Sequence, residues 1–527
     1  MRDFHLPGRS PTYAANGICA TSHPLAAKVA VQVLEEGGNA VDAAIAGAVL
    51  LGLCEPQMTG IGGDCFVLLK PAGSEDVIAL NGSGRAPAAL DAAEMRARGL
   101  TAVPEGGPEA VTVPGAVDAF CRLADAHGSW GLDRVLAPAI RYAEEGIPVA
   151  PRVAFDWAGD AGRIKGSARE KYLIGGKAPG VGQLFRAPFQ ADVLRRIASQ
   201  GRAGFYEGEV AQDMVAALKA AGGVHTMADF AATEATWGTP VSGTYKGVQL
   251  LEHPPNGQGA TAILLANILA QFDIASMEPF GAERAHIEAE ATKLAYDARN
   301  RFIADPAHVT RLDHMLAPET ARALAALIRR DAVLPTPPAP AEAVHRETIY
   351  ITVVDRDRMA VSLIYSVYDS FGSGIGSDRF GILLHNRGAG FTLTEGHPNE
   401  AKGGKRPLHT IIPAMLSNGG RITTAFGVMG GAYQATGHVR FLTNMADFGM
   451  DPQEAIDGPR SFADLEGALR VERGYSPAVH QALADLGHRV VTPSKPVGGA
   501  QAICIDRTNG VLVGGSDPRK DGCALGY

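Results

Sequence analysis

The stretch HRETIYITVVDRDRMAVSLIYSV, residues 345–367, contains two strand-like runs separated by the short polar turn RDR. This pattern is typical of a β-hairpin. With the turn centred on Asp357, Thr348 at the start of the first strand falls opposite Ser366 at the end of the second. Directly opposed side chains in an antiparallel pair have Cβ atoms about 5 Å apart. The sequence therefore predicts two hydroxyl groups in contact at the open end of the hairpin.

The segment in front of this hairpin, residues 331–346, is rich in proline and alanine. Because proline fixes φ and lacks an N–H donor, we expect an exposed, extended tether. Two interpretations of Thr348 follow. It is either half of an ordinary Thr–Ser cross-strand pair, or a nucleophile released by cleavage of the Glu347–Thr348 bond. Cleavage would give Thr348 a free α-amine, with an ordinary pKa of about 7.7–8.0, that can take the proton of its own hydroxyl.

Composition and charge exclude several classes of protein. The chain has 527 residues, 46% of them hydrophobic, and a net charge of −8, so we expect a large core and neither nucleic acid nor an anionic membrane as partner. The longest apolar run, AAIAGAVLLGLC, is too short to span a bilayer, and the N-terminus shows no secretory signal; we therefore expect a cytoplasmic protein. The fifteen histidines contain no HExxH motif, and we expect neither metal nor cofactor. The cysteines are expected to be small buried hydrophobes in a reducing compartment: Cys19, Cys54, Cys65, Cys121, Cys504 and Cys523.

Helical patterns dominate before the tether and strand patterns dominate after it. The stretch of residues 23–56 has the pattern of two helices separated at Gly37 and Gly38, and residues 285–305 have the longest helical pattern. Short apolar runs such as GILLH (381–385), RITTAFG (421–427) and AICIDR (502–507) resemble strands. Strand-rich layers packed between helical layers give an α+β sandwich. We expect residues 1–347, ending in the tether at 331–346, and residues 348–527 to build one such domain together.

Several blocks resemble the γ-glutamyltransferase family of N-terminal-nucleophile hydrolases, in the right order and over nearly the whole chain. They are LEEGGNAVDAAIA (34–46), GIGGDCFVLL (60–69), VPGAVDAF (113–120), EAEATKLAYDAR (288–299), GVMGGAYQ (427–434) and the ending GGSDPRKDGCALGY. The resemblance implies a four-layer αββα sandwich, made as a precursor and cut before a nucleophilic threonine. The two fragments would then pair as a heterodimer, and whether that pair dimerises further stays open.

The resemblance also implies roles for individual residues. Thr348 matches the nucleophile, and Ser366 stands where the family usually has a second threonine that binds the first. Gly430 and Gly431 match the pair whose N–H groups form the oxyanion hole. Two close donors and no Cβ are what a developing oxyanion requires.

The family's γ-glutamyl pocket is largely missing. Gly390 replaces the aspartate that holds the substrate ammonium, and Ser83 replaces the arginine that holds its carboxylate, with Arg85 two residues on. Four further candidate binding residues are Tyr368, Arg387, His409 and Thr410, some at family pocket positions with different chemistry. A positively charged pocket would favour a substrate with a carboxylate and no ammonium. The blocks around 387–391 and 397–413 are similar to a subgroup that includes oxamate amidohydrolase.

Each pocket residue also has a plainer interpretation. Arg85 would be a structural ion-pair partner, Arg387 a solvated charge, His409 a core histidine and Tyr368 a packing residue. Three functions stay open: hydrolysis of a small carboxylate-bearing amide, γ-glutamyl hydrolysis or transfer (or removal of a glutaryl-type acyl group), and ligand binding without catalysis. The favoured hypothesis is an oxamate-type amidohydrolase that processes itself.

Overall fold

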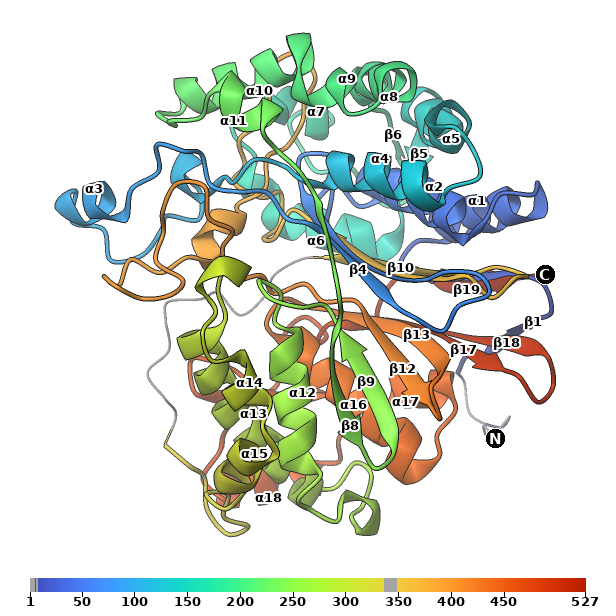
Figure 1. Ribbon diagram of the computed structural model, residues 1–527, viewed down its shortest axis with the longest axis vertical. Helices are drawn as coiled ribbons and strands as arrows, with labels where there is room; N and C mark the ends of the chain where they lie inside the picture. Colours follow the sequence, from blue (N-terminus) through green and yellow to red (C-terminus); the bar gives the residue numbers. More distant parts are fainter. Residues whose placement is uncertain (1–4, 6–7, 336–347) are drawn as a thin grey trace.

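The computed structural model describes residues 5, 8–335 and 348–527. The tether from residue 336 onward and Glu347 therefore lie outside the described residues. Two seven-stranded antiparallel sheets lie face to face with helices on both outer faces, so the chain runs in four layers, αββα (Figure 1). This confirms the predicted α+β sandwich.

The first sheet carries the hairpin at its centre. Its strands are, in order, β19 (Cys523–Gly526), β2 (Ile18–Thr21), β10 (Ile349–Val354), β11 (Ala360–Ser366), β3 (Asp64–Lys70), β4 (Ile78–Gly82) and β7 (Thr236–Gly238). The second sheet has the order β1 (Thr12–Ala14), β18 (Val511–Ser516), β17 (Gly499–Asp506), β13 (Arg421–Met429), β12 (Ala414–Asn418), β9 (Val248–Glu252) and β8 (Val241–Tyr245).

Both sheets contain strands from both sides of the tether. In the first sheet β10 pairs with β2 on one side and β11 pairs with β3 on the other, all antiparallel. Residues 1–335 and 348–527 therefore share both sheets, and neither part could complete a sheet alone. The run GILLH (381–385), predicted as a strand, forms only an isolated bridge between Gly376 and Leu383.

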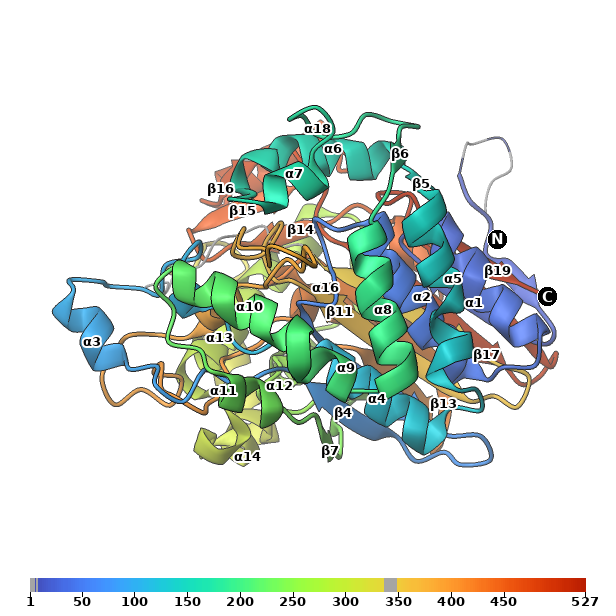
Figure 2. The ribbon, with the colours of Figure 1, turned by 90° about the horizontal axis from the view of Figure 1, so that it is seen from above.

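One helical layer covers the first sheet. It contains α1 (Pro24–Glu35), α2 (Ala40–Cys54), α4 (Ala116–His127), α5 (Leu132–Glu145), α6 (Pro151–Asp160), α8 (Pro188–Gln200) and α10 (Gly208–Ala220). In Figure 2 this layer is seen from above, with α8, α5, α2 and α1 side by side. The other layer contains α12 (Gly259–Leu269), α13 (Ala282–Phe302), α14 (Leu312–Leu316), α15 (Pro318–Ala325), α16 (Tyr433–Phe448), α17 (Pro452–Asp457) and α18 (Pro477–Asp485).

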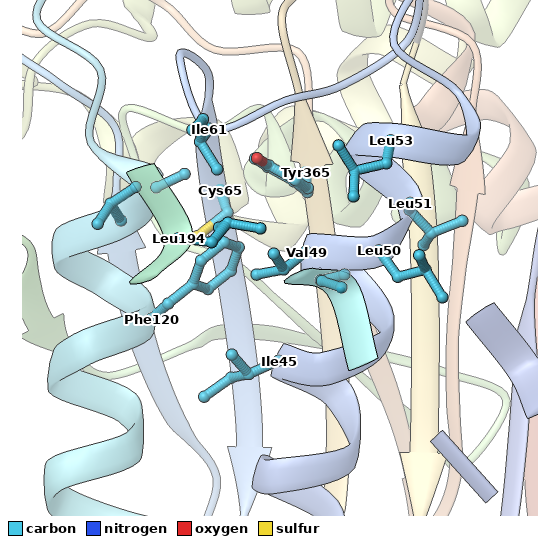
Figure 3. Packing of buried hydrophobic residues seen from close by; sticks show 14 of the residues in the cluster. Ile45, Val49, Leu50, Leu51, Leu53, Ile61, Cys65, Phe120, Leu194 and Tyr365 are labelled. Atoms are coloured by element: carbon cyan, nitrogen blue, oxygen red, sulfur yellow. The ribbon is translucent and has the colours of Figure 1, made fainter. Parts of the chain in front are cut away.

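Helix α2 shows how sequence determines this packing. Asn39 caps it by accepting from the N–H groups of Val41 and Asp42, while the Asp42 carboxylate accepts from the Asn39 N–H. All fifteen residues of the helix are buried, as expected for a helix that is apolar all round. Its side chains pack with Phe120, Leu194 and Tyr365 in the core between helices and sheet (Figure 3). This core holds the outer face of the hairpin rigidly.

A candidate active site between the two sheets

Strand register aligns four polar residues in one row across the first sheet. Ile349 pairs with Tyr365, so Thr348, one residue earlier, stands beside Ser366. Ser366 pairs with Asp64. Cys65 pairs with Gly82, so the next step of the same ladder places Ser83 beside Asp64. Residues side by side in neighbouring strands point to the same face. The row Thr348, Ser366, Asp64 and Ser83 therefore shares one face at the end of the sheet.

That face looks toward the second sheet. Two residues further along each strand, Tyr350, Ile364 and Phe66 pack with Met429 at the end of β13. Side chains alternate in direction along a strand, so the four-residue row points the same way as these apolar groups. The candidate nucleophile thus lies between the two sheets and not on the helical side.

Thr348 is buried, with 2% of its surface exposed. Its Oγ1 lies 3.4 Å from the Ser366 Oγ, to which it donates, and that oxygen also accepts from the Tyr368 N–H at 2.7 Å. The predicted register and the predicted hydroxyl pair are therefore both present. The Tyr368 amide orients the serine oxygen, and the serine oxygen in turn orients the threonine hydroxyl.

The two glycines follow β13 directly. Gly430 has φ +119° and Gly431 has φ +56°, both in the left-handed region that favours glycine. Among the described residues, their hydrogen bonds use their carbonyls: Tyr433 N–H donates to Gly430, and Gln434 N–H and Gln258 Nε2 donate to Gly431. The sixteen-residue helix α16 begins at Tyr433. Two N–H groups just before a helix N-terminus suit a developing negative charge.

Replacing Gly430 with alanine should strongly reduce activity. An added Cβ would lie 2.8 Å from the Gly498 Cα, which is a backbone clash, and φ is +119°. Displacing an oxyanion donor costs about 10²–10³-fold in kcat. Steady-state turnover, with the fragments first checked on a denaturing gel, measures the effect. Gly449→Ala is the matched control, because φ is +63° there and the Cβ would meet nothing within 4 Å. Equal losses in both variants would contradict the oxyanion role.

A buried cluster of side chains surrounds Asp64, one of the four residues of this row. Arg387 binds both Asp64 oxygens, with Nε at 3.0 Å and Nη2 at 3.1 Å, and His409 Nε2 lies 2.6 Å from Oδ2. Arg387 Nη1 donates to the Thr410 hydroxyl at 3.2 Å, and the guanidinium lies 4.2 Å from the centre of the Tyr368 ring. The side chains of Asp64, Arg387 and His409 are fully buried. The structure thus brings four of the five predicted pocket residues together.

The cluster corrects the prediction of a positively charged pocket. Burial would raise the pKa of Asp64, but Arg387 and His409 hold it well below its usual value. Burial, together with the Arg387 charge, lowers the pKa of His409 to about 3. At neutral pH one carboxylate therefore offsets one guanidinium, and the imidazole is uncharged. The electrostatic argument for a carboxylate-selective pocket is wrong on this point.

Asp64 is the residue that sequence reasoning missed. It opens the buried strand DCFVLLK, and a charge in such a strand costs free energy unless it is paired. That cost could have signalled a buried partner. Its partners, Arg387 and His409, lie more than 300 residues away, so the sequence offered no way to name them.

Gln258 was also missed, because its glycine-rich segment PPNGQGATA (254–262) lacks the lysine spacing of a phosphate loop and indicates no other role. Its Nε2 donates to the carbonyls of Thr410 at 2.6 Å and Gly431 at 3.2 Å, and its backbone N–H donates to the backbone carbonyl of His409. Arg299 Nη1 donates to its Oε1 at 3.1 Å. Gln258 therefore ties the Asp64 cluster to the glycine pair.

Arg85 does not join the cluster. Its side chain is 47% exposed, and its Nη1 binds Asp305 at 3.2 Å and the Gly404 carbonyl at 2.9 Å. The interpretation of Arg85 as a structural ion-pair partner is the one this geometry supports.

Three side chains elsewhere could share an ion. His286 and Glu290 of α13 and His488 have ligand atoms within 4.8 Å of one another, the one such group among residues 5, 8–335 and 348–527. However, His286 and His488 hydrogen-bond each other at 2.8 Å. Glu290 accepts from Lys293 and from the Leu334 N–H. The three side chains therefore already have hydrogen-bond partners, and Glu290 holds the first part of the tether at Leu334. All six cysteines are unpaired, four of them buried as expected.

Comparisons with known proteins identify the family. A family model described as gamma-glutamyltranspeptidase matches residues 26–527. The glutathione hydrolase-like YwrD proenzyme of Bacillus subtilis is 38% identical over 96% of this chain and 97% of its own length. The oxamate amidohydrolase proenzyme of Klebsiella pneumoniae is 33% identical over 98% of this chain and 100% of its own. This chain belongs to the gamma-glutamyltranspeptidase family.

Solved structures of the gamma-glutamyltranspeptidase family agree with the fold. Cephalosporin acylase from Bacillus halodurans superposes with a TM-score of 0.93 at 37% identity, covering 100% of this chain and 99% of that one. A Helicobacter pylori gamma-glutamyltranspeptidase chain gives 0.57 at 28% identity, over 63% of this chain and 95% of its own. The sandwich is thus the N-terminal-nucleophile hydrolase fold of the family. In the part of the chain that the structure describes, every helix is too short or too polar to cross a membrane.

Proposed function

We propose that this member of the gamma-glutamyltranspeptidase family is an autoprocessing amidohydrolase with Thr348 as its nucleophile. The observation that carries the proposal is the contact between Thr348 and Ser366 at the head of β10, 3.4 Å between hydroxyl oxygens. Thr348 directly follows the proposed cleavage point, and Met429, which packs with Tyr350 two residues along from Thr348, directly precedes the glycine pair suited to an oxyanion. The proenzyme names of its relatives support the same interpretation.

The proposed processing step is intramolecular. Thr348 Oγ attacks the Glu347 carbonyl, the peptide C–N bond breaks, and the acyl group moves to oxygen as an ester. Water then hydrolyses this ester, which leaves a new carboxylate on Glu347 and a free α-amine on Thr348. The hydroxyl needs orientation for this attack, and Ser366, positioned by the Tyr368 N–H, supplies it.

The proposed catalytic cycle repeats the chemistry on a substrate. The α-amine of Thr348 takes the hydroxyl proton as Oγ attacks the amide carbon. The N–H groups of Gly430 and Gly431 stabilise the oxyanion, at about 3 kcal/mol per donor. The amine or ammonia of the substrate takes this proton from Thr348 and leaves. Water then hydrolyses the acyl ester and releases the acid.

The Asp64 cluster supports a small acyl group without an amino-acid head. Where relatives bind an ammonium and a carboxylate, this chain has buried side chains already paired with one another. An incoming α-ammonium would meet no unpaired carboxylate there, and a buried unpaired charge is costly. An oxamate-type monoamide is the first candidate, supported by the 33% identity to a relative named oxamate amidohydrolase proenzyme and not by the charge of the cluster. A glutaryl-type amide is the second, favoured by the likeness to a cephalosporin acylase at TM-score 0.93.

A matched substrate panel tests this proposal. We expect ammonia release from oxamate to exceed p-nitroaniline release from γ-glutamyl-p-nitroanilide by about tenfold or more in kcat/KM, since pocket polarity can discriminate at least this strongly. Glutaryl-p-nitroanilide, which lacks the α-ammonium, is the comparison for the head group. Faster turnover of the γ-glutamyl substrate than of both others would overturn the substrate proposal. Ligand binding by an uncleaved chain without turnover would overturn the proposed activity.

A further inference from the structure

A cavity of about 450 Å³ lies at the β4–β7 edge of the first sheet, away from Thr348. Its lining combines charged and apolar groups, among them Arg85, Trp237, His253, Asp305, Leu312 and Arg406. A pocket of this size with a few convergent polar groups is typical of a small-molecule site.

Two arginines of this cavity contact the same carboxylate, but only one of them does so through its guanidinium group. Arg85 Nη1 binds Asp305 Oδ2 at 3.2 Å, whereas Arg406 reaches the same oxygen with its backbone N–H, at 2.8 Å. The Arg406 side chain donates instead to the carbonyls of Ser83 and Glu234. Burial lowers the pKa of His253 to about 4, so its ring is neutral near pH 7. The lining therefore carries one uncompensated positive charge.

Several N–H groups of Arg85 and Arg406 remain available to donate hydrogen bonds to an anion. Among the described residues, Nε and Nη2 of Arg85 and Nη1 of Arg406 have no hydrogen-bond partner. Burial and the nearby Arg85 charge lower the pKa of Arg406 to about 10. A bound anion would relieve the repulsion between the two guanidinium groups. Charge-assisted bonds from guanidinium to carboxylate are among the stronger hydrogen bonds in proteins.

The rest of the lining is apolar. Trp237 is 39% exposed although it is large and aromatic. Pro254, Pro306, Val309 and Leu312 complete this wall. A lining that combines an aromatic side chain with a pair of guanidinium groups matches a ligand with an apolar body and one acidic end.

The cavity is separate from the candidate active site. From Ser83 to Thr348 the row crosses three strand spacings, about 14 Å. Aromatic rings lie between the two regions. The Phe66 ring stacks on that of His253, which lines the cavity, with 3.8 Å between ring centroids, and it lies tilted against the His409 ring of the Asp64 cluster at 4.4 Å. A small ligand in the cavity could not place its own amide at Thr348.

We propose that this cavity binds an organic monoanion, a carboxylate carried by an aromatic or branched apolar body, at a site distinct from the acyl site. The carboxylate accepts hydrogen bonds from Arg85 and Arg406, and the apolar body packs on Trp237. This proposal does not depend on the activity proposed above, since it concerns neither Thr348 nor the reaction.

The test is a titration of the full-length protein by tryptophan fluorescence, with phenylacetate as the probe. Phenylacetamide, of the same shape but uncharged, is the matched ligand. We expect saturable quenching by phenylacetate at millimolar concentrations or below, and binding at least tenfold weaker for phenylacetamide. Trp237→Phe should remove the signal, because neither of the other two tryptophans, Trp130 and Trp157, lines the cavity. No saturation, equal binding of the amide, or a signal that survives in Trp237→Phe would each overturn the proposal.

Replacing Arg85 alone tests whether its guanidinium group contributes to the binding of phenylacetate. Arg85→Gln should weaken phenylacetate binding about tenfold or more, since hydrogen bonds to charged groups contribute substantially. Arg85 is half exposed, so this variant should fold, and circular dichroism verifies that. Arg322→Gln is the matched control, an exposed arginine paired with Glu319 on α15. If both variants bind phenylacetate equally well, the assigned site is wrong.

Discussion

Replacing Thr348 with alanine should leave one full-length chain of about 55 kDa and abolish amide hydrolysis. Without Oγ there is no nucleophile for the Glu347 carbonyl or for a substrate amide. Loss of a catalytic nucleophile lowers kcat by a factor on the order of 10⁶. The wild-type chain should instead run as two bands, residues 1–347 and 348–527. A denaturing gel with N-terminal sequencing of the smaller band, expected to begin Thr-Ile-Tyr-Ile, makes the measurement.

Thr348→Ser is the matched control for this experiment. It keeps the hydroxyl and should still process, if more slowly. Ser366→Ala should process more slowly than the wild type, because it removes the oxygen 3.4 Å from Thr348 Oγ1. Cleavage of Thr348→Ala at the same bond would show that another group is the nucleophile. An active wild-type protein that stays in one piece would show that no free α-amine is needed.

Asp64→Asn should destabilise the protein by about 3–5 kcal/mol, the usual cost of removing one partner of a buried ion pair. The substitution leaves the Arg387 guanidinium without its bidentate partner, and both side chains are fully buried. The measurement is urea unfolding, carried out in the Thr348→Ala background so that every variant is one continuous chain. This background separates stability from processing.

A double-mutant cycle and a surface control accompany this measurement. Arg387→Gln alone should also destabilise the fold, and the Asp64→Asn, Arg387→Gln double variant should lose less than the sum of the two single losses. Glu319→Gln removes an exposed ion pair with Arg322 and should cost no more than about 1 kcal/mol. If Asp64→Asn costs no more than Glu319→Gln, the cluster does not hold the site together.

The predictable part of the site rests on local patterns. Alternation along residues 348–354 and 360–366, with a turn between them, was enough to derive the register that pairs Thr348 with Ser366. The order of the helical and strand-rich segments indicated an α+β sandwich, whereas its four-layer αββα form was expected only from the family resemblance. The prediction of a strand for the run GILLH was wrong, because the run is short and apolar, and periodicity cannot distinguish such a strand from a buried loop.

The charge of the pocket could not be predicted in the same way. Arg387 and His409 both contact Asp64 in the row that contains Thr348, but their electrostatic effect was inferred without Asp64. Arg85 was expected with them and lies instead in the cavity at the β4–β7 edge. These errors have one cause, since the net charge of a pocket depends on which residues, distant in the sequence, form ion pairs within it.

The sequence by itself determined the hairpin, its register and the hydroxyl pair at its open end, because strand alternation and turn length act between residues close in the chain. Only the tertiary structure decided that Asp64, more than 300 residues before Arg387 and His409, neutralises the pocket. Full burial forces that pairing, since an isolated charge there would lose its hydration with nothing in return.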